Sequence, residues 1–563
     1  MRSPQNVLES LSSKACNSNY QYQRLYRNLY NPEFYLTAYQ KIQAKQGSMI
    51  AGTDGKTVDG MGMKHINALI AKLRDFSYHP SPARRTYIPK ANGKKRPLGI
   101  PSFDDKLVQE VVRMILESIY EPTFLNTSHG FRPKRSCHTA LQYVQKNFTG
   151  VKWFVEGDIK GCFDHVDHHV LVNILRRRIQ DEHFIGLIWK FLKAGYMEDW
   201  VYHNTYSGTP QGSIISPILA NIYLNELDVF MAQYAQTFRQ GDKRRINPYV
   251  DPMDDGYKRL VYVRYADDFL IGVIGSKVDA KQVKADVGQF IRQQLLLELS
   301  QEKTLITHGS DFAQFLSFQI TTSTEQNSTR AKAGYIKRSY TGRIKLYVPK
   351  EKWLKRLLSY GALKIQYDKN NGNKEIWEPI CRFGLRNLDD LEILNQYNAE
   401  IRGLYNYYRI AHNATVLNNF LYVMKYSMYK TFAGKYRTSM RKIIQKYTKN
   451  RDFVITYQGK SGEKSVVFYN QGMRRDTHVS ATDPDIIGRA RENRNYTSLV
   501  QRLRGCQCEW CGATDVEIEI HHVKKLKDLS GRAEWERHMI ARRRKTMALC
   551  HNCHVKLHAG KLD

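Results

Sequence analysis

The chain has 563 residues, which exceeds one ordinary domain and predicts roughly three to five domains. Lys and Arg number 87 against 54 Asp and Glu, so the formal net charge is +33 at pH 7. A protein this basic is expected to meet a polyanion, and nucleic acid is favoured over an anionic membrane or a merely solvated surface. No run of about 18 apolar residues occurs, which excludes a membrane-spanning helix, so no membrane partner is expected.

The N-terminus and the cysteines bear on the compartment. The N-terminal residues have no apolar core, which excludes a secretory signal, whereas their Arg and Ser content with one acidic residue is compatible with an organellar presequence. Of the nine cysteines, five crowd the last tenth of the chain and four are scattered. That distribution indicates metal binding in a reducing compartment rather than a disulfide framework, and a bacterial cytoplasm is expected over an organelle.

The first elements in chain order are helices and a basic hairpin. Helical patterns fill residues 21–80, apart from a polar, glycine-containing loop at 47–62. Residues 84–101 then predict a strand, a basic turn and a returning strand. Lys94 and Arg96 near this turn would present cations to a phosphate-bearing ligand, although a solvated turn explains them equally well when taken alone.

A strand and a loop in the middle of the chain carry polar residues suited to a nucleotide site. After an amphipathic helix predicted at 105–120, a strand ends at Asp158 and the chain breaks at Gly161. An Asp at the carboxyl end of a strand suits a metal ion facing a cleft, although it also suits a strand cap. The loop Thr209-Pro210-Gln211-Gly212 precedes a helix predicted at 217–234, and its backbone amides would approach a nucleotide.

Residues 260–273 predict a β-hairpin with an acidic tip. Two runs of β-branched and aromatic residues flank the polar turn Tyr265-Ala266-Asp267-Asp268. An Asp pair suits a turn without any further role. One such carboxylate, together with another from elsewhere in the chain, can also bind two Mg²⁺ ions a few ångströms apart.

Beyond the hairpin the sequence predicts short elements and loops. Residues 299–304 are expected to close a helix, and 315–318 to form a strand. Two stretches rich in Asn, Gly, Thr and Lys, 321–335 and 366–374, indicate loops or a linker. Between and beyond them the chain is predicted to be helical and basic.

Three motifs occur in an order that resembles a known polymerase class. Asp158 after a strand, the 209–212 loop and the 265–268 turn together resemble the palm of reverse transcriptases. The phrases RPLGIP at 96–101 and SHGFRP at 128–133 are similar to those of group II intron-encoded reverse transcriptases, and the similarity covers nearly the whole chain. It is close to the bacterial lactococcal type that carries an endonuclease domain. The resemblance implies a multidomain α+β protein: a right-hand polymerase with an antiparallel palm sheet, a helical thumb or maturase domain, a DNA-binding segment and a nuclease module.

The resemblance also implies a two-metal polymerase site. Asp158, Asp267 and Asp268 match the family's metal-binding carboxylates and would hold two Mg²⁺ ions. One ion would lower the pKa of the primer 3′-hydroxyl, and the other would neutralise the triphosphate and the leaving pyrophosphate. The reaction implied is RNA-templated DNA synthesis from dNTPs.

Four further residues match family positions around the incoming nucleotide. Phe163 matches the aromatic residue that packs under the sugar, where a 2′-hydroxyl would clash, and this favours dNTPs over NTPs. Gln211 matches the residue beside the incoming nucleotide. Lys94 and Arg96 lie where family members place fingers cations against the triphosphate, and either of them fits that position.

Two cysteine pairs near the C-terminus have the spacing of a zinc site. Cys508-x2-Cys511 and Cys550-x2-Cys553 predict a structural, tetrahedral site for Zn²⁺. A domain of this size cannot rely on its core alone, which favours a structural metal. Cys506 falls outside both pairs and is expected to be a spare thiol.

The histidines between and after these cysteines resemble the HNH endonuclease motif, a ββα-metal nuclease fold. By that resemblance His522 is the general base that activates water. His521, His554 and His558 would bind a divalent ion, expected to be Mg²⁺, on the scissile phosphate. The chain departs from the motif at the central Asn, because none occurs at 544–549. A zinc ribbon that binds DNA with idle histidines is the alternative.

The predicted domain order follows from these motifs. The N-terminal extension and the start of the fingers occupy 1–80, and the fingers and palm occupy 81–325. The thumb or maturase region occupies 326–440, a DNA-binding segment 441–500, and the HNH module 501–563. The resemblance implies that the protein binds group II intron RNA as a ribonucleoprotein, binds a double-stranded DNA target and uses dNTPs.

The function implied is that of a multifunctional mobile-intron protein. It would promote splicing of the intron RNA, cleave a DNA target strand, and copy the RNA into cDNA from the resulting 3′-hydroxyl. Two alternatives are a splicing factor with a vestigial polymerase and a stand-alone reverse transcriptase. The retained carboxylates argue against the first, and the maturase-like helices and the nuclease module argue against the second.

Overall fold

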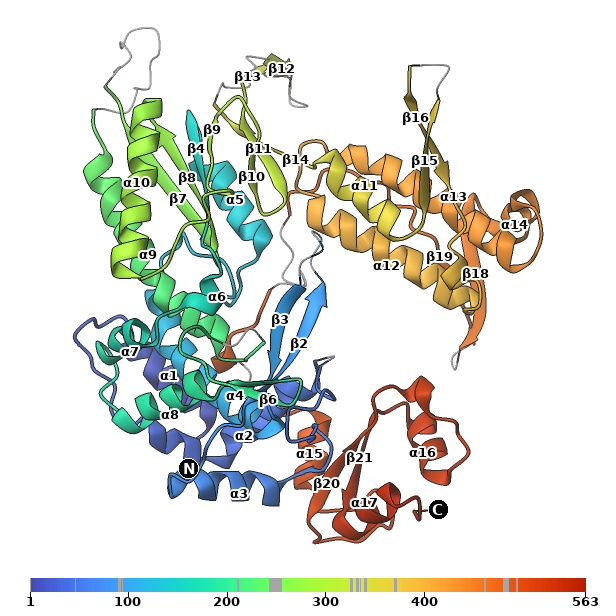
Figure 1. The fold of residues 1–563 in the computed structure, drawn as a ribbon. Coiled ribbons are helices and arrows are strands. Elements are labelled where there is room, and N and C mark those ends of the chain that lie inside the picture. Colours follow the sequence, from blue (N-terminus) through green and yellow to red (C-terminus); the bar gives the residue numbers. More distant parts are fainter. Residues whose placement is uncertain are drawn as a thin grey trace.

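The computed structural model describes most of the chain, and Figure 1 gives its arrangement. The described residues are 2–45, 47–89, 93, 95–209, 212–241, 256–324, 328–330, 334, 336–338, 342–368, 372–459, 462–478, 486–492 and 495–562. Two residues expected near the nucleotide, Lys94 and Gln211, lie outside these ranges. No helix within these ranges is both long and apolar enough to span a membrane.

The N-terminal part of the chain is helical and surrounds helix α4. Its helices are α1 (Pro4–Lys14), η1 (Tyr26–Tyr30), α2 (Pro32–Gln43), α3 (Met63–Arg74), α4 (Phe103–Tyr120) and η2 (Glu121–Thr123). Helix α4 was expected to be amphipathic, but nearly every one of its residues is buried, because α1, α2 and α9 pack around it. Three of its charged residues pair within the helix: Arg113 donates to Glu110 at 2.8 Å and also to Glu117.

The predicted basic hairpin is part of a sheet of strand order β3-β2-β5-β6. Its strands are β2 (Ala83–Pro89), β3 (Lys95–Ile100), β5 (Tyr196–Glu198) and β6 (Val201–His203). Strands β2 and β3 pair antiparallel, which confirms the hairpin, and β5 adds to β2 in parallel. Gly212 lies against β3 with a φ of 104°, and a Cβ there would come within 2.5 Å of the Gly99 carbonyl oxygen. Only glycine fits this contact between the 209–212 loop and the sheet.

An antiparallel sheet of order β7-β8-β4-β9 carries the acidic turn. Its strands are β4 (Trp153–Asp158), β7 (Arg259–Tyr265), β8 (Asp268–Ile274) and β9 (Ile306–His308). These bounds confirm the predicted strand ending at Asp158 and the predicted hairpin. Gly157 on β4 leaves room for the Phe269 ring, since a Cβ at Gly157 would lie 2.1 Å from it.

Helices surround this sheet and connect its strands. They are α5 (Cys137–Asn147), α6 (Cys162–His165), α7 (His168–Arg176), α8 (Glu182–Lys193), α9 (Ser216–Phe238) and α10 (Lys277–Gln294). Helix α9 confirms the helix predicted after the 209–212 loop. In Figure 1, α9 and α10 lie on one side of the sheet, and α5 lies toward the opposite side.

Two predicted elements beyond α10 are wrong. Residues 299–304 lie outside any helix, because α10 ends at Gln294 and the chain returns to the sheet, where Leu299 bridges Ile159. Residues 315–318 are not one strand, because Leu316 and Ser317, with φ of 49° and 61°, form the turn between β10 and β11. The strands here are β10 (Ala313–Phe315), β11 (Phe318–Thr322), β12 (Ser328–Arg330), β13 (Ile336–Arg338) and β14 (Ile344–Tyr347).

Helices α11–α14 form a lobe to one side of the sheets (Figure 1). Its helices are α11 (Lys350–Ser359), η3 (Phe383–Leu385), α12 (Asp390–Tyr408), η4 (Ala414–Val416), α13 (Leu417–Lys435) and α14 (Met440–Tyr447). Its strands are β15 (Leu363–Asp368), β16 (Lys374–Pro379), β17 (Thr448–Lys449), β18 (Asp452–Gly459) and β19 (Gly462–Val467). Phe453 and Phe468 belong to the same buried core as Tyr397 and Phe432, so the β18–β19 hairpin is an integral part of this lobe.

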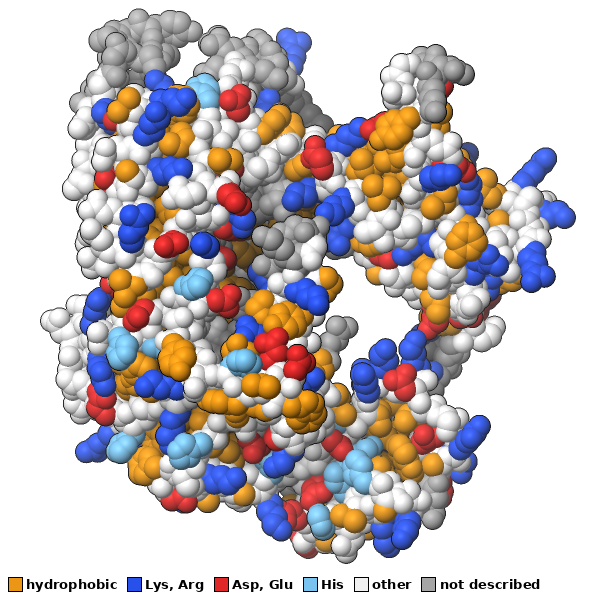
Figure 2. Space-filling view, viewed as in Figure 1, with side chains coloured by type: hydrophobic (Ala, Val, Ile, Leu, Met, Phe, Trp, Pro, Cys, Tyr) orange, Lys and Arg blue, Asp and Glu red, His pale blue; other side chains and the backbone are white. Residues whose placement is uncertain are grey.

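The C-terminal module packs on the N-terminal helices (Figure 1) and also touches the α11–α14 lobe, where the Lys527 ammonium lies 3.5 Å from the Glu392 carboxylate of α12. Its elements are α15 (Ser498–Arg504), β20 (Ile518–His522), η6 (Leu526–Asp528), α16 (Glu534–Arg542), β21 (Thr546–Cys550) and α17 (His551–His558), and η5 (Ala490–Glu492) precedes them. The β20–β21 hairpin gains a third strand, β1 (Met61–Gly62), from the stretch predicted only as a loop. Figure 2 shows a hollow between this module and the α11–α14 lobe, with Lys and Arg side chains along its edges.

A buried ion pair fixes the hairpin that carries the acidic turn. The Arg264 side chain is fully buried on β7, and it donates to the Asp228 carboxylate of α9 at 2.8 and 2.5 Å. The same guanidinium donates to the Ala266 carbonyl at 2.9 Å and to the Ser128 hydroxyl at 2.8 Å. The Tyr262 hydroxyl is a further donor to Asp228. Strand, helix and turn are therefore held by one hydrogen-bond network with its charges balanced.

We predict that Asp228→Asn destabilises the protein strongly, because it leaves the Arg264 charge buried without its counter-ion. Loss of one partner of a buried pair costs about 3–5 kcal/mol, which corresponds to a fall in the thermal unfolding midpoint of roughly 10 °C. The matched control is Glu226→Gln on the same helix, whose exposed partner is Arg177. A midpoint for Asp228→Asn within 2 °C or so of that control would contradict the prediction.

Candidate functional site

Three carboxylates predicted to act together meet at one end of the β7-β8-β4-β9 sheet. Asp158, the last residue of β4, lies directly opposite Asp268, the first residue of β8, and Asp267 precedes it in the turn. Ala266 occupies the left-handed region with a φ of 55°. Gly130 lies against this turn, where a Cβ would come within 2.3 Å of the Ala266 nitrogen. The SHGFRP segment, 128–133, therefore packs closely on the turn.

The carboxylates are crowded and partly buried, which raises the pKa values of Asp267 and Asp268. Burial, with the charges of Asp267 and Asp158 next, raises the pKa of Asp268 to about 7. Burial likewise raises the pKa of Asp267, which Arg96 and Lys303 partly offset. The Lys303 ammonium lies 2.9 Å from the Asp158 carboxylate and partly neutralises the cluster. Such a set of carboxylates fits divalent cations, because an ion would relieve the repulsion that now favours protonation.

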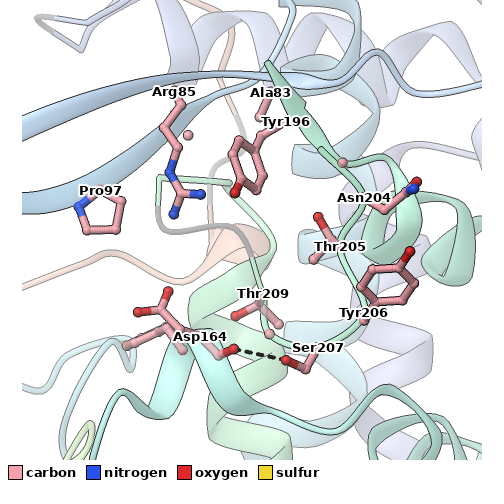
Figure 3. Close-up of a pocket in the computed structure, with 14 residues that line it drawn as sticks. Ala83, Arg85, Pro97, Asp164, Tyr196, Asn204, Thr205, Tyr206, Ser207 and Thr209 are labelled. Atoms are coloured by element: carbon pink, nitrogen blue, oxygen red, sulfur yellow. Dashed lines mark hydrogen bonds between the residues drawn. The ribbon is translucent and has the colours of Figure 1, made fainter. Parts of the chain in front are cut away.

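A cavity of about 310 Å³ lies between the β3-β2-β5-β6 sheet and helix α6 (Figure 3). Phe163 contributes to its lining and packs edge-on against Phe131, with ring centroids 6.1 Å apart. Figure 3 shows Arg85 and Tyr196 on one side and the 204–209 loop on the other. The Arg85 guanidinium lies over the Tyr196 ring at 3.9 Å. The lining therefore combines aromatic rings with one cation, Arg85, and one carboxylate, Asp164, which suits a base or a sugar. The three clustered carboxylates are not part of this lining.

The loop that begins at Thr209 is anchored directly to the helix that carries Phe163. The Thr209 amide donates to the Phe163 carbonyl at 2.6 Å, and the Gly208 amide donates to the Val166 carbonyl at 2.8 Å. The Ser207 hydroxyl donates to the Asp164 carbonyl at 3.2 Å, the contact dashed in Figure 3. These bonds place the start of the 209–212 loop beside Phe163. Arg96 lies on β3 near enough to Asp267 to favour its charged form.

The four paired cysteines come together as the spacing predicts. The sulfur atoms of Cys508, Cys511, Cys550 and Cys553 all lie within 4.8 Å of one another. The Cys511 and Cys550 sulfurs are 3.9 Å apart, against about 3.8 Å for two thiolates on one tetrahedral zinc ion. Burial opposes ionisation of Cys508, but backbone donors at the site outweigh it and lower the pKa of this thiol to about 7. The donor set therefore fits Zn²⁺.

The second donor cluster contains three of the four predicted histidines and one unexpected carboxylate. The cluster consists of one ring nitrogen from each of His521, His554 and His558 and one carboxylate oxygen of Asp59. These four atoms all lie within 4.8 Å of one another. The Nδ1 of His554 lies 2.6 Å from Glu519, which orients the opposite nitrogen toward the cluster. His521 is 5% exposed, and neither ring nitrogen has a hydrogen-bond partner of good geometry. A divalent ion would satisfy this buried ring, so the cluster fits the predicted metal.

His522 is not part of that donor group. Its ring packs edge-on against Tyr39 of α2, and the Tyr39 hydroxyl lies 3.3 Å from the Nε2 nitrogen. Burial lowers the pKa of His522 to about 4, so the ring is neutral at physiological pH and able to accept a proton. Its backbone N–H donates to Asp59 at 2.6 Å.

Several residues at these sites were not found by sequence reasoning. Lys303 lies where the sequence predicts the end of a helix, and Asp59 lies where it predicts a loop. For Arg264 and Asp228, the only signal in the sequence is a charged residue within an otherwise apolar segment. Such a residue needs a buried partner, so this signal could have pointed to the pair.

Three regions of the chain match models of known protein families. Residues 88–320 match the reverse transcriptase (RNA-dependent DNA polymerase) family. Residues 341–473 match the type II intron maturase family, and residues 508–554 match the AI2M/AI1M-like HNH endonuclease family. With the crowded carboxylates on the central sheet, these matches define a reverse transcriptase fold joined to a maturase and a nuclease.

Whole-chain relatives identify the family more closely. The group II intron-encoded protein LtrA of Lactococcus lactis subsp. cremoris is 41% identical, with 97% of this chain and 98% of that protein covered. A 91 kDa protein in a cob intron of Schizosaccharomyces pombe is 34% identical over 99% of this chain and 72% of its own. The chain therefore belongs to the group II intron-encoded proteins. It is a multifunctional member that carries reverse transcriptase, maturase and HNH endonuclease regions.

Among solved structures, apo telomerase from Candida tropicalis, truncated from its C-terminal domain, aligns with a TM-score of 0.32. The sequence identity is 15%, and 51% of this chain and 63% of that chain are covered. This likeness is too low to support any inference about the site.

We predict that Cys553→Ser abolishes zinc binding, because it removes one of four ligands from the cysteine site. Purified wild-type protein should contain one zinc per chain by elemental analysis, and the variant close to none. The control is Cys506→Ser, an exposed cysteine outside the cluster, which should retain the full zinc content. Equal zinc content in both variants would contradict the assigned ligand set.

Proposed function

We propose that the protein performs target-primed reverse transcription of a group II intron. In this proposal it promotes splicing of the intron RNA, cleaves one DNA strand, and extends the new 3′-hydroxyl with the intron RNA as template. The observation that carries the proposal is the meeting of Asp158, Asp267 and Asp268 in a chain that also holds the histidine cluster. One site would produce the primer that the other consumes.

For polymerisation, the residues of the palm would bind and orient the reacting groups. Asp158, Asp267 and Asp268 would hold two Mg²⁺ ions, which when bound activate the primer hydroxyl and stabilise charge on the triphosphate. Lys303 would balance the negative charge of the carboxylates before substrate arrives, given its 2.9 Å contact with Asp158. The Arg264 network would hold the turn rigidly, so the carboxylates would need little reorganisation during the reaction.

The cavity beside Phe163 would bind the incoming dNTP. The ring would pack under the sugar and leave no room for a 2′-hydroxyl, which selects dNTPs. The bond from the Thr209 amide to the Phe163 carbonyl supports this assignment, because it ties the start of the 209–212 loop to the residue that carries the ring. Lys94 and Arg96 are proposed triphosphate contacts, and Gln211 is proposed to lie beside the nucleotide.

The remaining parts would bind nucleic acid. A thumb or maturase region at 326–440 is proposed to grip the intron RNA by shape and phosphate contacts, as the maturase family match supports. A segment at 441–500 is proposed to contact target DNA, in agreement with the net charge of +33. The bacterial relative favours a bacterial cytoplasm as the compartment.

The nuclease chemistry would take place at the histidine cluster. His521, His554 and His558 would hold a divalent ion that, when bound, polarises the scissile phosphate. His522 would accept a proton from the attacking water: burial keeps its ring neutral, but by lowering its pKa to about 4 it also makes the ring a weaker base until the site opens. Because the Tyr39 hydroxyl lies against Nε2, Tyr39 would have to move before His522 reaches a substrate.

We predict that Asp267→Ala abolishes cDNA synthesis while splicing assistance and DNA cleavage stay nearly intact. Loss of a metal ligand should slow primer extension on an RNA template with Mg²⁺ by about a thousandfold, or roughly 4 kcal/mol. The control is Asp311→Ala, an exposed carboxylate on the same region of the chain, which should extend primers normally. Loss of all three activities in a folded Asp267→Ala protein would overturn the modular proposal.

We predict the opposite pattern for His522→Ala. Removal of the proposed base should stop cleavage of the DNA strand but leave primer extension unchanged, because the two sites lie on different sheets. Strand-specific cleavage of labelled target DNA by the ribonucleoprotein measures this. His538→Ala, in the same module but outside the donor cluster, is the control, and an undiminished cleavage rate for His522→Ala would rule out the assigned base.

A further inference from the structure

The nuclease module is completed by the opposite end of the chain. Strand β1 pairs with β20 with Met61 opposite Ile520, and the Gly60 amide donates to the Ile520 carbonyl at 3.1 Å. Met61 is 1% exposed and lies in one buried core with Ile520. Strand addition of this kind fixes β1 by backbone hydrogen bonds and by a buried side chain.

This pairing brings the Asp59 carboxylate into the histidine cluster. One carboxylate oxygen accepts the His522 backbone N–H at 2.6 Å and lies 3.2 Å from Nδ1 of His521. The other oxygen lies 2.9 Å from Nε2 of His558 and 3.6 Å from Nε2 of His554. The two Nε2 atoms are themselves 3.1 Å apart. Each carboxylate oxygen therefore faces at least one histidine nitrogen.

These separations match those of ligands around a single ion. Donor atoms bound at about 2.1 Å lie about 3.0 Å apart at right angles in an octahedral shell and about 3.4 Å apart in a tetrahedral one. The triangle formed by Asp59, His554 and His558 has edges of 2.9, 3.1 and 3.6 Å. His521 provides a second observation. Its ring is buried, and neither ring nitrogen makes a well-formed hydrogen bond, as expected of a metal ligand without its ion.

We propose that Asp59 is a fourth protein ligand of the nuclease divalent ion, so that the ion is shared between the N-terminal part of the chain and the HNH module. The inference rests on the proposed nuclease function and goes beyond the three histidines of its motif. A carboxylate added to three neutral imidazoles lowers the net positive charge of the occupied site and shifts its preference toward Mg²⁺ or Mn²⁺, which favour oxygen ligands. In an octahedral shell two positions remain for a phosphate oxygen and water.

Orienting contacts around the cluster agree with this assignment. Metal-binding histidines commonly donate their second nitrogen to a carboxylate, and Glu519 accepts that bond from His554 at 2.6 Å. Glu519 lies opposite Gly62 in the β1–β20 register, where a Cβ on Gly62 would come within 2.9 Å of the Ile518 carbonyl oxygen. The glycine therefore permits the close approach that delivers Asp59.

Docking of the module is reinforced away from the ion. Tyr496 and Arg504 both bind Glu33 on α2, and the Thr497 amide donates to Gln40 at 3.2 Å. These contacts hold the two parts together without the metal, so replacement of Asp59 should weaken ion binding without releasing the module.

The test is a Mn²⁺ titration of the full-length protein, with zinc already in the cysteine site. Pulsed electron paramagnetic resonance detects nitrogen coupling only from histidine-bound Mn²⁺, which separates this site from the carboxylates of the palm. Asp59→Asn should need at least tenfold more Mn²⁺ to reach half of that signal, because an amide is a weaker ligand of the same shape. Asp54→Asn, an exposed residue of the same loop, is the control and should titrate as wild type.

His554→Ala separates failure of this inference from failure of the proposed function. If His554→Ala titrates with Mn²⁺ as wild type, the nuclease centre itself is misassigned. If His554→Ala needs more Mn²⁺ to reach half of the signal but Asp59→Asn titrates as wild type, only the role of Asp59 is overturned.

Hydrogen exchange gives a second measurement that does not depend on activity. An ion shared by β1 and the HNH module must stabilise their pairing, so Mn²⁺ should slow exchange of the amides at 58–62 in the wild-type protein and in Asp54→Asn. The slowing should be absent in Asp59→Asn. Equal slowing in Asp59→Asn would overturn the proposal.

Discussion

The polymerase half of the molecule depends on one buried ion pair, Arg264 with Asp228. Two charges without water are costly, and they are tolerated here because nearly every donor and acceptor of the pair is used. Arg264 donates to the carbonyl of Ala266, the residue of the turn that lies in the left-handed region. A strained turn needs such support, since nothing in its own sequence prefers that conformation.

The acidic cluster that this network positions has a charge opposite in sign to that of the whole protein. With a net charge of +33, the surface favours phosphate backbones of RNA and DNA at long range. The carboxylates of Asp158, Asp267 and Asp268 form a small region of opposite sign within it, and the Lys303 ammonium lies 2.9 Å from Asp158. If the carboxylates hold the proposed metal ions, substrate attraction and metal binding depend on different groups, a basic surface and an acidic cluster.

Much of the fold and of the site could be predicted from sequence where a short segment determines its own structure. The β7–β8 hairpin, the strand ending at Asp158 and the paired cysteines are of this kind, because periodicity and spacing are local properties. The turn at Leu316 and Ser317 could not be predicted, because it uses positive φ without Gly or Asn. Lys303 and Asp59 could not be predicted either, because their roles arise from contacts with Asp158 and His521, far away in the chain.

The position of β1 has a consequence for how the protein is made. Asp59 and the His522 amide that it binds are 463 residues apart. At the usual pace of translation, roughly 20 to 90 seconds separate the synthesis of the two partners. During that interval β1 has been synthesised but its partner β20 has not, so the two strands cannot yet pair. Because β20 carries His521 and His522, the proposed nuclease site can form only in chains whose synthesis has passed β20.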